Sequence, residues 1–392
     1  MYVVGIDCSW FRTPFLRHRF LVTTETQIER LRRSNIEAVD IDPSKGFDVT
    51  SFPIEKDALH TIGFDTSIQA PPVHATPRSL VTLNQELALA RETCEKLAQS
   101  VKAVFDEIGK TGVAIPGPVN EAVQEITIVT RTLSTHAIFM AMSHGRQLGD
   151  SFSNHSLAVC TLAMIVGHAL DYDPMKLHEL ATGALLHDIG LLQLPGHLSR
   201  ATTHLSGEDL TAFRHHPRLG AIAIEAQREF SQTVRQIAAE HHVTPDGRGY
   251  PSEASPHSTA EASRIVMIAD RYDELVTGFG GLKPLPSHEA IQQLFQEGEF
   301  GRLDLRLVSL YIKLVGIYPV YSFVELNTKE RGMITTINPA TLHQPIVALT
   351  YDTTGSAYGN PLTVDLSHQD QPPLRSIKRV IASGSEEVSH AA

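Results

Sequence analysis

The chain has 392 residues, of which 42% are hydrophobic and 20% charged, a composition typical of a globular protein with two or three domains. Its net charge of −11 provides no general cationic surface, which argues against a nucleic acid polymer as partner. Cys8, Cys94 and Cys160 have no paired spacing, which argues against a disulfide framework and a cysteine-based zinc site. Any bound metal must therefore use histidine and carboxylate ligands.

The sequence shows no segment that would take the chain into a membrane. The longest apolar run, from Leu157 to Leu170, is too short to span a bilayer and contains His168. The N-terminus lacks the pattern of a signal peptide. We therefore expect a cytoplasmic protein without a membrane span.

Residues 1–65 are predicted to form a small α+β regulatory domain. Short β-like runs occur at Tyr2–Ile6, Phe20–Thr23 and Ile36–Ile41. Between the last two, Thr24–Gln27 is a capping box that begins a helix. No catalytic set of side chains is visible in this part of the chain.

A linker is predicted over residues 66–79, where three prolines lie among small polar residues. Long helices leading into the next domain are expected over residues 80–142, the second of them from about Val119 to Met142. In the first, apolar residues recur at alternating steps of three and four from Leu80 to Ile108, an apolar stripe of four heptads. The stripe can pack within its own chain, or it can join two parallel copies, in which case we expect a homodimer.

Eleven of the 20 histidines lie between His155 and His257, in a region of helical pattern. Histidines and aspartates recur at the ends of its apolar helices, at intervals of 32, 28, 25 and 28 residues, each about one helix with its connection. These positions are His155, His187, Asp188, His216, His241, His242 and Asp270. One such histidine alone is more often a core or surface group, but the set indicates a metal site at which each helix supplies one or two ligands.

The adjacent pair His187 and Asp188 is the core of this set. Neighbouring helical residues point about 100° apart, so both side chains can approach one ion from the end of their helix. The carboxylate of Asp188 can also bridge to a second ion.

These positions resemble the motifs of the HD-GYP phosphodiesterases, a branch of the HD-domain metallohydrolases that cleave cyclic dinucleotides. The resemblance covers about residues 130–300. Its motifs are His155-Ser156, Leu185–Gly190 (LLHDIG), His216–Gly220 (HPxxG), His241-His242 (HH), Asp246–Pro251 (the GYP signature) and Ala262–Asp270, which resembles the closing ARIxxIAD. The N-terminal segment is similar to a small domain commonly fused ahead of HD-GYP domains, and Tyr318–Asn338 resembles a β extension that often follows them.

The resemblance implies a mainly α fold, a multi-helix HD-domain bundle over residues 143–316. A β-rich extension is expected over residues 317–382, followed by a disordered tail over residues 383–392. It also implies two divalent metal ions, with Fe or Mn favoured and Zn, Ni or Mg as alternatives. Ser151 stands where members with three ions have a glutamate, so two ions are expected.

The family's ligand pattern carries over to this chain residue by residue. His155, His187 and Asp270 would hold one ion, His216, His241 and His242 the other, and Asp188 would bridge them. Asp188 and His187 would be the catalytic residues. The substrate-binding residues would be Arg248, Gly249, Tyr250, Pro251 and Lys283.

The function implied is hydrolysis of cyclic di-GMP, or a related cyclic dinucleotide, to linear pGpG or GMP in bacterial second-messenger signalling. Diguanylate cyclases or other signalling proteins would be its protein partners. The chain also departs from the family at three places. Leu191 replaces the lysine after HDIG, Val243 replaces the glutamate after HH, and Phe279–Lys283 replaces an RPYR-type cation pair. The alternative is therefore a weakly active sensor or protein-interaction module that binds metal and nucleotide.

Overall fold

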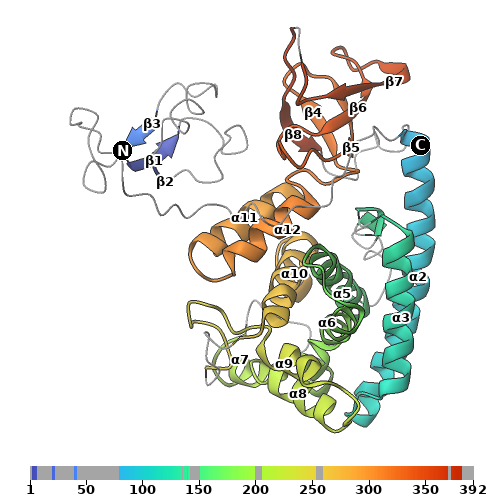
Figure 1. Cartoon of the computed structure of the whole chain (residues 1–392), viewed down its shortest axis with the longest axis vertical. Helices are drawn as coiled ribbons and strands as arrows, with labels where there is room; N and C mark the ends of the chain where they lie inside the picture. The colour runs from blue at the N-terminus through green and yellow to red at the C-terminus, as the bar shows by residue number, and fades with distance from the viewer. Residues whose placement is uncertain are drawn as a thin grey trace. The chain divides into compact units, whose positions relative to one another are not determined.

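The computed structural model of the chain describes residues 2–6, 20–22, 39–41, 79–134, 136–138, 140–141, 151–198, 205–252, 259–369 and 372–381. The chain divides into two compact units, Met1–Gln69 and Ala70–Ala392. The second unit is mainly helical with a small antiparallel sheet, so the expected fold class is confirmed (Figure 1). None of the helices in these ranges is long and apolar enough to cross a membrane.

The first unit contains a three-stranded antiparallel sheet. Its strands are β1 (Tyr2–Ile6), β2 (Phe20–Leu21) and β3 (Val39–Ile41), in the order β2-β1-β3. All three lie within the β-like runs of the sequence. The predicted helix after Thr24, most of the predicted linker and the C-terminal tail lie outside the described residues.

The second unit begins with a long helix, α2 (Leu80–Thr111), which is followed by α3 (Pro116–Thr132). The side chain of Ser79 caps α2 by accepting a hydrogen bond from the backbone N–H of Thr82, and Gly112 ends it in the left-handed conformation. The predicted second helix to Met142 is wrong in length. The observed helix, α3, ends at Thr132, where Leu133 adopts an extended backbone, and a new helical turn starts after Ser134.

The apolar stripe of α2 is buried within the chain itself. Helix α2 packs against α3 and α5 (Ser151–Ala169). The buried members of the stripe are Leu83, Ala90, Cys94, Leu97, Val101, Val104 and Ile108. Intramolecular packing therefore accounts for the stripe, which gives no support to the expected homodimer.

The helical bundle is built around α5 and α6 (Pro174–Leu186), which are buried over most of α5 and over the second half of α6. These buried parts are mostly apolar, as expected of helices at the centre of a bundle. The two helices pack against each other and are contacted by α2, α3, α9 (Gln232–Glu240), α10 (Glu261–Thr277) and α12 (Leu305–Val315). The bundle also contains α7 (Gly207–Phe213), α8 (His216–Glu225) and α11 (Ser287–Glu299).

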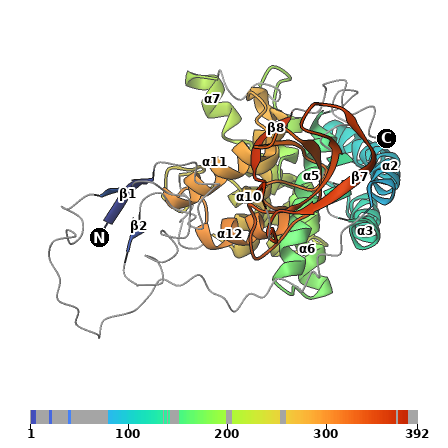
Figure 2. The ribbon, with the colours of Figure 1, turned by 90° about the horizontal axis from the view of Figure 1, so that it is seen from above.

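The bundle is followed by a five-stranded antiparallel sheet in the order β7-β6-β5-β4-β8. Figure 2 labels its two edge strands, β7 and β8. Its strands are β4 (Phe323–Leu326), β5 (Arg331–Thr336), β6 (Ile346–Tyr351), β7 (Ala357–Asp365) and β8 (Ile377–Ile381). The central strands β5 and β6 are buried, whereas the edge strand β7 is largely exposed. The sheet lies within the stretch predicted to be β-rich.

Candidate metal centre

The seven predicted ligands come together inside the bundle, each from the end or the inner face of a helix. His187 and Asp188 follow α6, His216 begins α8, and His241 and His242 follow α9. The other two are His155 in the first part of α5 and Asp270 in α10. His155, His187, His216 and His241 are 0% exposed and the two aspartates 5%, while His242 is half-buried.

Three of these imidazoles are fixed by the same kind of contact. The Nδ1 atoms of His187, His216 and His241 lie 2.8, 2.9 and 2.9 Å from the carbonyl oxygen three residues earlier. Each carbonyl belongs to the last turn of a helix, where carbonyls lack main-chain partners. Because Nδ1 donates this hydrogen bond, it carries the ring proton and Nε2 presents a lone pair.

His155 is oriented by a residue that was not anticipated from the sequence, Asp273. Its Nδ1 atom lies 2.7 Å from Oδ2 of Asp273, which is on α10 and is 1% exposed. Asp273 stands three residues after Asp270, so both carboxylates face the same side of the helix. That spacing was the one available signal in the sequence.

The four Nε2 atoms converge on Asp188. Its Oδ1 atom lies 3.1 Å from Nε2 of His216 and 3.3 Å from Nε2 of His241. Its Oδ2 atom lies 3.8 Å from Nε2 of His155 and 3.6 Å from Nε2 of His187. Each oxygen of one carboxylate thus faces its own pair of imidazoles.

The remaining two predicted ligands complete these pairs. Oδ1 of Asp270 lies 3.3 Å from Nε2 of His155 and 3.8 Å from Nε2 of His187. His242 belongs to the other group, with its ring centroid 4.2 Å from that of His241.

The donor atoms fit divalent cations. They form two groups with the spacing needed to hold an ion, and Asp188 belongs to both: Asp188, His216, His241 and His242, and His155, His187 and Asp188. The Nε2 atoms of His216 and His241 are 3.2 Å apart, and two lone pairs at that distance repel unless a cation or proton lies between them. The buried Nε2 of His187 and Oδ1 of Asp188 have no hydrogen-bond partner, which a metal ion would supply.

The charges of the site favour ligation. Burial would raise the pKa of Asp188, but the surrounding imidazoles hold it well below its usual range, so this carboxyl is ionised. Burial lowers the pKa of His187 to about 4 and that of His242 well below its usual range, so both rings are neutral near pH 7. His155 differs, because hydrogen bonds to Asp270 and Asp273 outweigh the effect of burial and raise its pKa to about 10. A metal ion at His155 would replace a proton.

Two glycines of the motifs allow the ligand-bearing segments to touch. A side-chain carbon on Gly190 would collide with the carbonyl of His216 and with the backbone N of Gly220. One on Gly249 would collide with the carbonyl of His242, to which Tyr250 N donates a hydrogen bond of 3.0 Å. The motif glycines therefore set the distance between neighbouring ligand groups.

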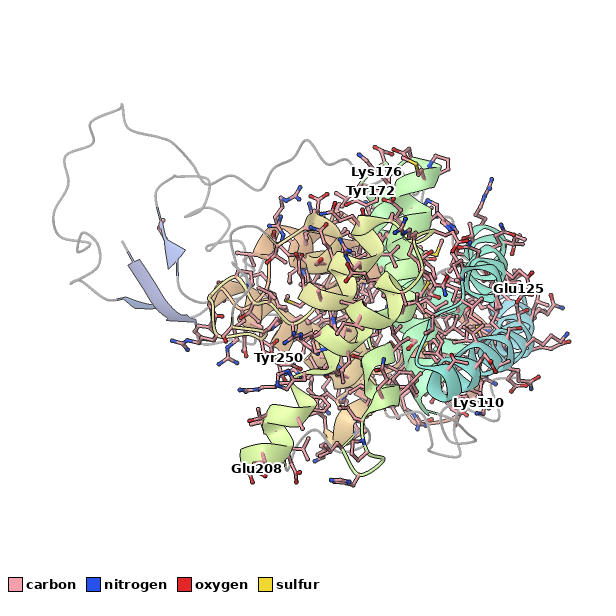
Figure 3. The ribbon with its side chains drawn as sticks, turned by 90° about the horizontal axis from the view of Figure 1, so that it is seen from below. Lys110, Glu125, Tyr172, Lys176, Glu208 and Tyr250 are labelled. Atoms are coloured by element: carbon pink, nitrogen blue, oxygen red, sulfur yellow. The ribbon has the colours of Figure 1, made fainter. Side chains whose placement is uncertain are left out.

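The predicted substrate-binding residues divide into two sets. Tyr250, which is labelled in Figure 3, has its ring centroid 4.5 Å from that of the ligand His242, and Gly249 and Pro251 flank it in the chain. Arg248 does not lie beside the ligands: its side chain is 81% exposed, and its Nε atom lies 3.9 Å from Oδ2 of Asp246. Lys283 is likewise exposed, and the structure gives it no contact with a ligand.

Apolar side chains occupy the positions at which the chain departs from the family pattern. The ring of Phe279 stacks on that of His155, with centroids 3.8 Å apart and an interplanar angle of 7°. Leu191 and Val243 are each 3% exposed, so neither reaches solvent. All three departures are evident in the sequence, but the covering of a ligand by Phe279 was not anticipated from it.

Two family models match the chain. Residues 126–307 match the HD domain, and residues 1–113 match a domain of unknown function, DUF3391. A cyclic di-GMP phosphodiesterase of Pseudomonas aeruginosa is 26% identical over 95% of this chain and 87% of its own length.

Two proteins of Vibrio cholerae match shorter parts of the chain. A cyclic di-GMP phosphodiesterase is 30% identical over 36% of this chain and 29% of its own length. A 3′3′-cGAMP-specific phosphodiesterase is 31% identical over 23% of this chain and 17% of its own length. The chain therefore covers less than a third of either Vibrio protein.

Proposed function

We propose that this chain, whose residues 126–307 match the HD-domain family, is a metal-dependent phosphodiesterase of the HD-GYP branch that hydrolyses cyclic di-GMP. The single observation that carries this proposal is the placement of Asp188, whose two oxygens each face a pair of imidazole Nε2 atoms. A carboxylate shared between two ligand groups is what a binuclear centre for phosphodiester hydrolysis requires.

In this proposal His155, His187 and Asp270 would hold one ion, His216, His241 and His242 would hold the other, and Asp188 would be shared by both groups. Mixed imidazole and carboxylate ligation suits Fe or Mn, and also Zn. When bound, two such ions supply a hydroxide nucleophile at neutral pH and neutralise phosphate charge.

The side chains around the site orient the ligands and exclude water. The last-turn carbonyls and Asp273 orient four of the rings through Nδ1, so the Nε2 atoms of His155, His187, His216 and His241 face the proposed ion positions. Phe279 covers one face of His155, while Tyr250 packs beside His242. Water adds across one P–O3′ bond, which leaves a 5′-phosphate and a free 3′-hydroxyl in linear pGpG, and a second hydrolysis gives GMP. None of these steps requires a serine, cysteine or lysine nucleophile.

Acting on a second messenger, the enzyme would work in the bacterial cytoplasm, where it would oppose a diguanylate cyclase. A second candidate function is that of a weakly active sensor, and one observation favours it. Arg248 and Lys283, the two expected phosphate-binding cations, point into solvent.

The test is hydrolysis by the purified full chain loaded anaerobically with Fe or Mn. Cyclic di-GMP and 3′3′-cGAMP are supplied in parallel, and the products are separated by chromatography. We expect pGpG to appear, and a chelator to stop its formation. Tight binding of cyclic di-GMP without products would support the sensor, and an absence of both binding and products would overturn the proposal. Turnover of 3′3′-cGAMP alone would show that the proposed substrate is wrong but that the proposed reaction, phosphodiester hydrolysis, is right.

A further inference from the structure

A cyclic dinucleotide carries two phosphodiesters, but a single centre reacts with only one at a time. The second phosphate keeps its negative charge, and it must bind to a protein whose net charge is −11. Without a local cation this charge would be repelled from the site. A substrate of this kind therefore needs a cation near the metal centre but outside it.

Arg214 is a cation next to the ligand set that no motif of the sequence indicates. It directly follows α7, and its Cζ atom lies 5.5 Å from the ring centroid of Tyr250. The Tyr250 ring lies in turn 4.5 Å from the ring of His242 and 6.0 Å from that of His216, centroid to centroid. Guanidinium, phenol ring and metal-ligand imidazoles thus follow one another from the surface inwards.

The backbone of Arg214 is fixed to the same turn that presents His216. Its N–H donates a hydrogen bond of 3.0 Å to the carbonyl of Leu210. The carbonyl of the preceding residue, Phe213, accepts the hydrogen bond from Nδ1 of His216. The position of the guanidinium is therefore tied to that of a metal ligand.

The charge of Arg214 is not neutralised by any of the described residues. Other arginines of the bundle and sheet bind carboxylates, such as Arg264 with Asp304 at 2.9 Å and Arg375 with Glu330 at 2.7 Å. Arg214 is exposed, and within the described parts of the chain its guanidinium lies over the face of the Tyr250 ring and forms no ion pair. A guanidinium in this state is free to bind an anion.

We propose that Arg214 binds the unreacted phosphate of the cyclic dinucleotide and so determines specificity for substrates with two phosphodiesters. This role rests on the proposed function, because it requires that such a substrate binds at the metal centre. The planar guanidinium can donate two parallel hydrogen bonds to a phosphate, and its contact with the Tyr250 ring limits its orientations. Arg214 takes the role that was expected, from the sequence, of Arg248 and Lys283.

The experiment compares Arg214→Gln and Arg214→Lys with wild type on two substrates. Cyclic di-GMP carries two phosphodiesters, whereas bis(p-nitrophenyl) phosphate carries one and has no second phosphate to bind. Hydrogen bonds to charged groups typically change binding by about 10- to 100-fold. We expect Arg214→Gln to raise KM for cyclic di-GMP by about that factor, with kcat/KM for the small diester and the metal content unchanged. Arg214→Lys keeps the charge but not the planar fork, so its effect should be intermediate.

The matched control is Arg235→Gln, which changes the net charge equally. Arg235 on α9 forms an ion pair of 2.8 Å with Glu225 on the exposed surface. Arg235→Gln should therefore leave the kinetic constants for both substrates unchanged. If Arg214→Gln lowers kcat/KM equally for both substrates, Arg214 has a structural role and the inference is overturned. An unchanged KM for cyclic di-GMP would also overturn the inference.

Binding of cyclic di-GMP, measured by calorimetry, separates this inference from the proposed function. If wild type binds but does not hydrolyse the dinucleotide, the proposed reaction fails, and weaker binding by Arg214→Gln alone would still support the inference. If wild type does not bind the dinucleotide, both are overturned.

Discussion

Nδ1 of His155 lies 2.7 Å from Oδ2 of Asp273, and this contact joins α5 to α10 at the metal centre. It is formed by a side chain, whereas the anchors of His187, His216 and His241 are main-chain carbonyls. A substitution can therefore remove it.

Asp273→Ala should lower the affinity for the ion proposed to bind at His155 by about 10- to 100-fold, because loss of a hydrogen-bond partner of a metal ligand typically has an effect of that size. The ion at His216 and His241 should be retained, because its ligands keep their anchors. Metal affinity measured by competition with a chelator checks this. Asp273→Asn is the control, since its amide oxygen still accepts a hydrogen bond and should preserve more affinity. Equal affinities in wild type and Asp273→Ala would contradict the assigned role.

Gly190→Ala should destabilise the fold and lower metal content together. The added methyl group would meet the backbone of His216 and Gly220, which cannot move aside as a flexible side chain can. Overpacking typically costs about 1 to 3 kcal/mol, and a clash with backbone belongs at the upper end. Thermal unfolding and elemental analysis measure the two effects. Gly196→Ala, at a position with open space around it, should change neither.

Leu97→Ala should cost about 2 to 5 kcal/mol of stability, because Leu97 is 5% exposed in the apolar stripe of α2. Leu89→Ala, on the same helix but 54% exposed, should cost less than about 0.5 kcal/mol. Chemical denaturation of both variants makes the comparison. If the stripe packs inside one chain, the Tm should not depend on protein concentration. A Tm that rises with protein concentration would instead indicate that the stripe forms a dimer interface.

The regular spacing of histidines and aspartates made the candidate ligand set visible in the sequence, because the ligands stand mostly at helix ends and each helix with its connection has a similar length. His155 and Asp270 are 115 residues apart in the chain, yet their spacing from the other ligands indicated one site. The mainly α fold was implied by the resemblance of these positions to the HD-GYP motifs.

Features that depend on tertiary contacts were not predictable in this way. No strong helix-breaking residue in the sequence marks the end of α3 at Thr132, because Leu133 and Ser134 also occur within helices. Arg248 was chosen for its place in the GYP signature, but a surface loop gives no periodic signal of where its side chain points. Arg214 was missed for the same reason, since only the folded chain brings it against Tyr250.

In the proposed binuclear centre Asp188 belongs to two metal sites at once. The most direct test is the number of transition-metal ions per chain, measured by elemental analysis after anaerobic, metal-supplemented expression. Wild type should hold two, and Asp188→Ala should lose most of both while its helical circular dichroism is kept. Fewer than one ion per wild-type chain, or two ions retained in Asp188→Ala, would contradict the binuclear centre.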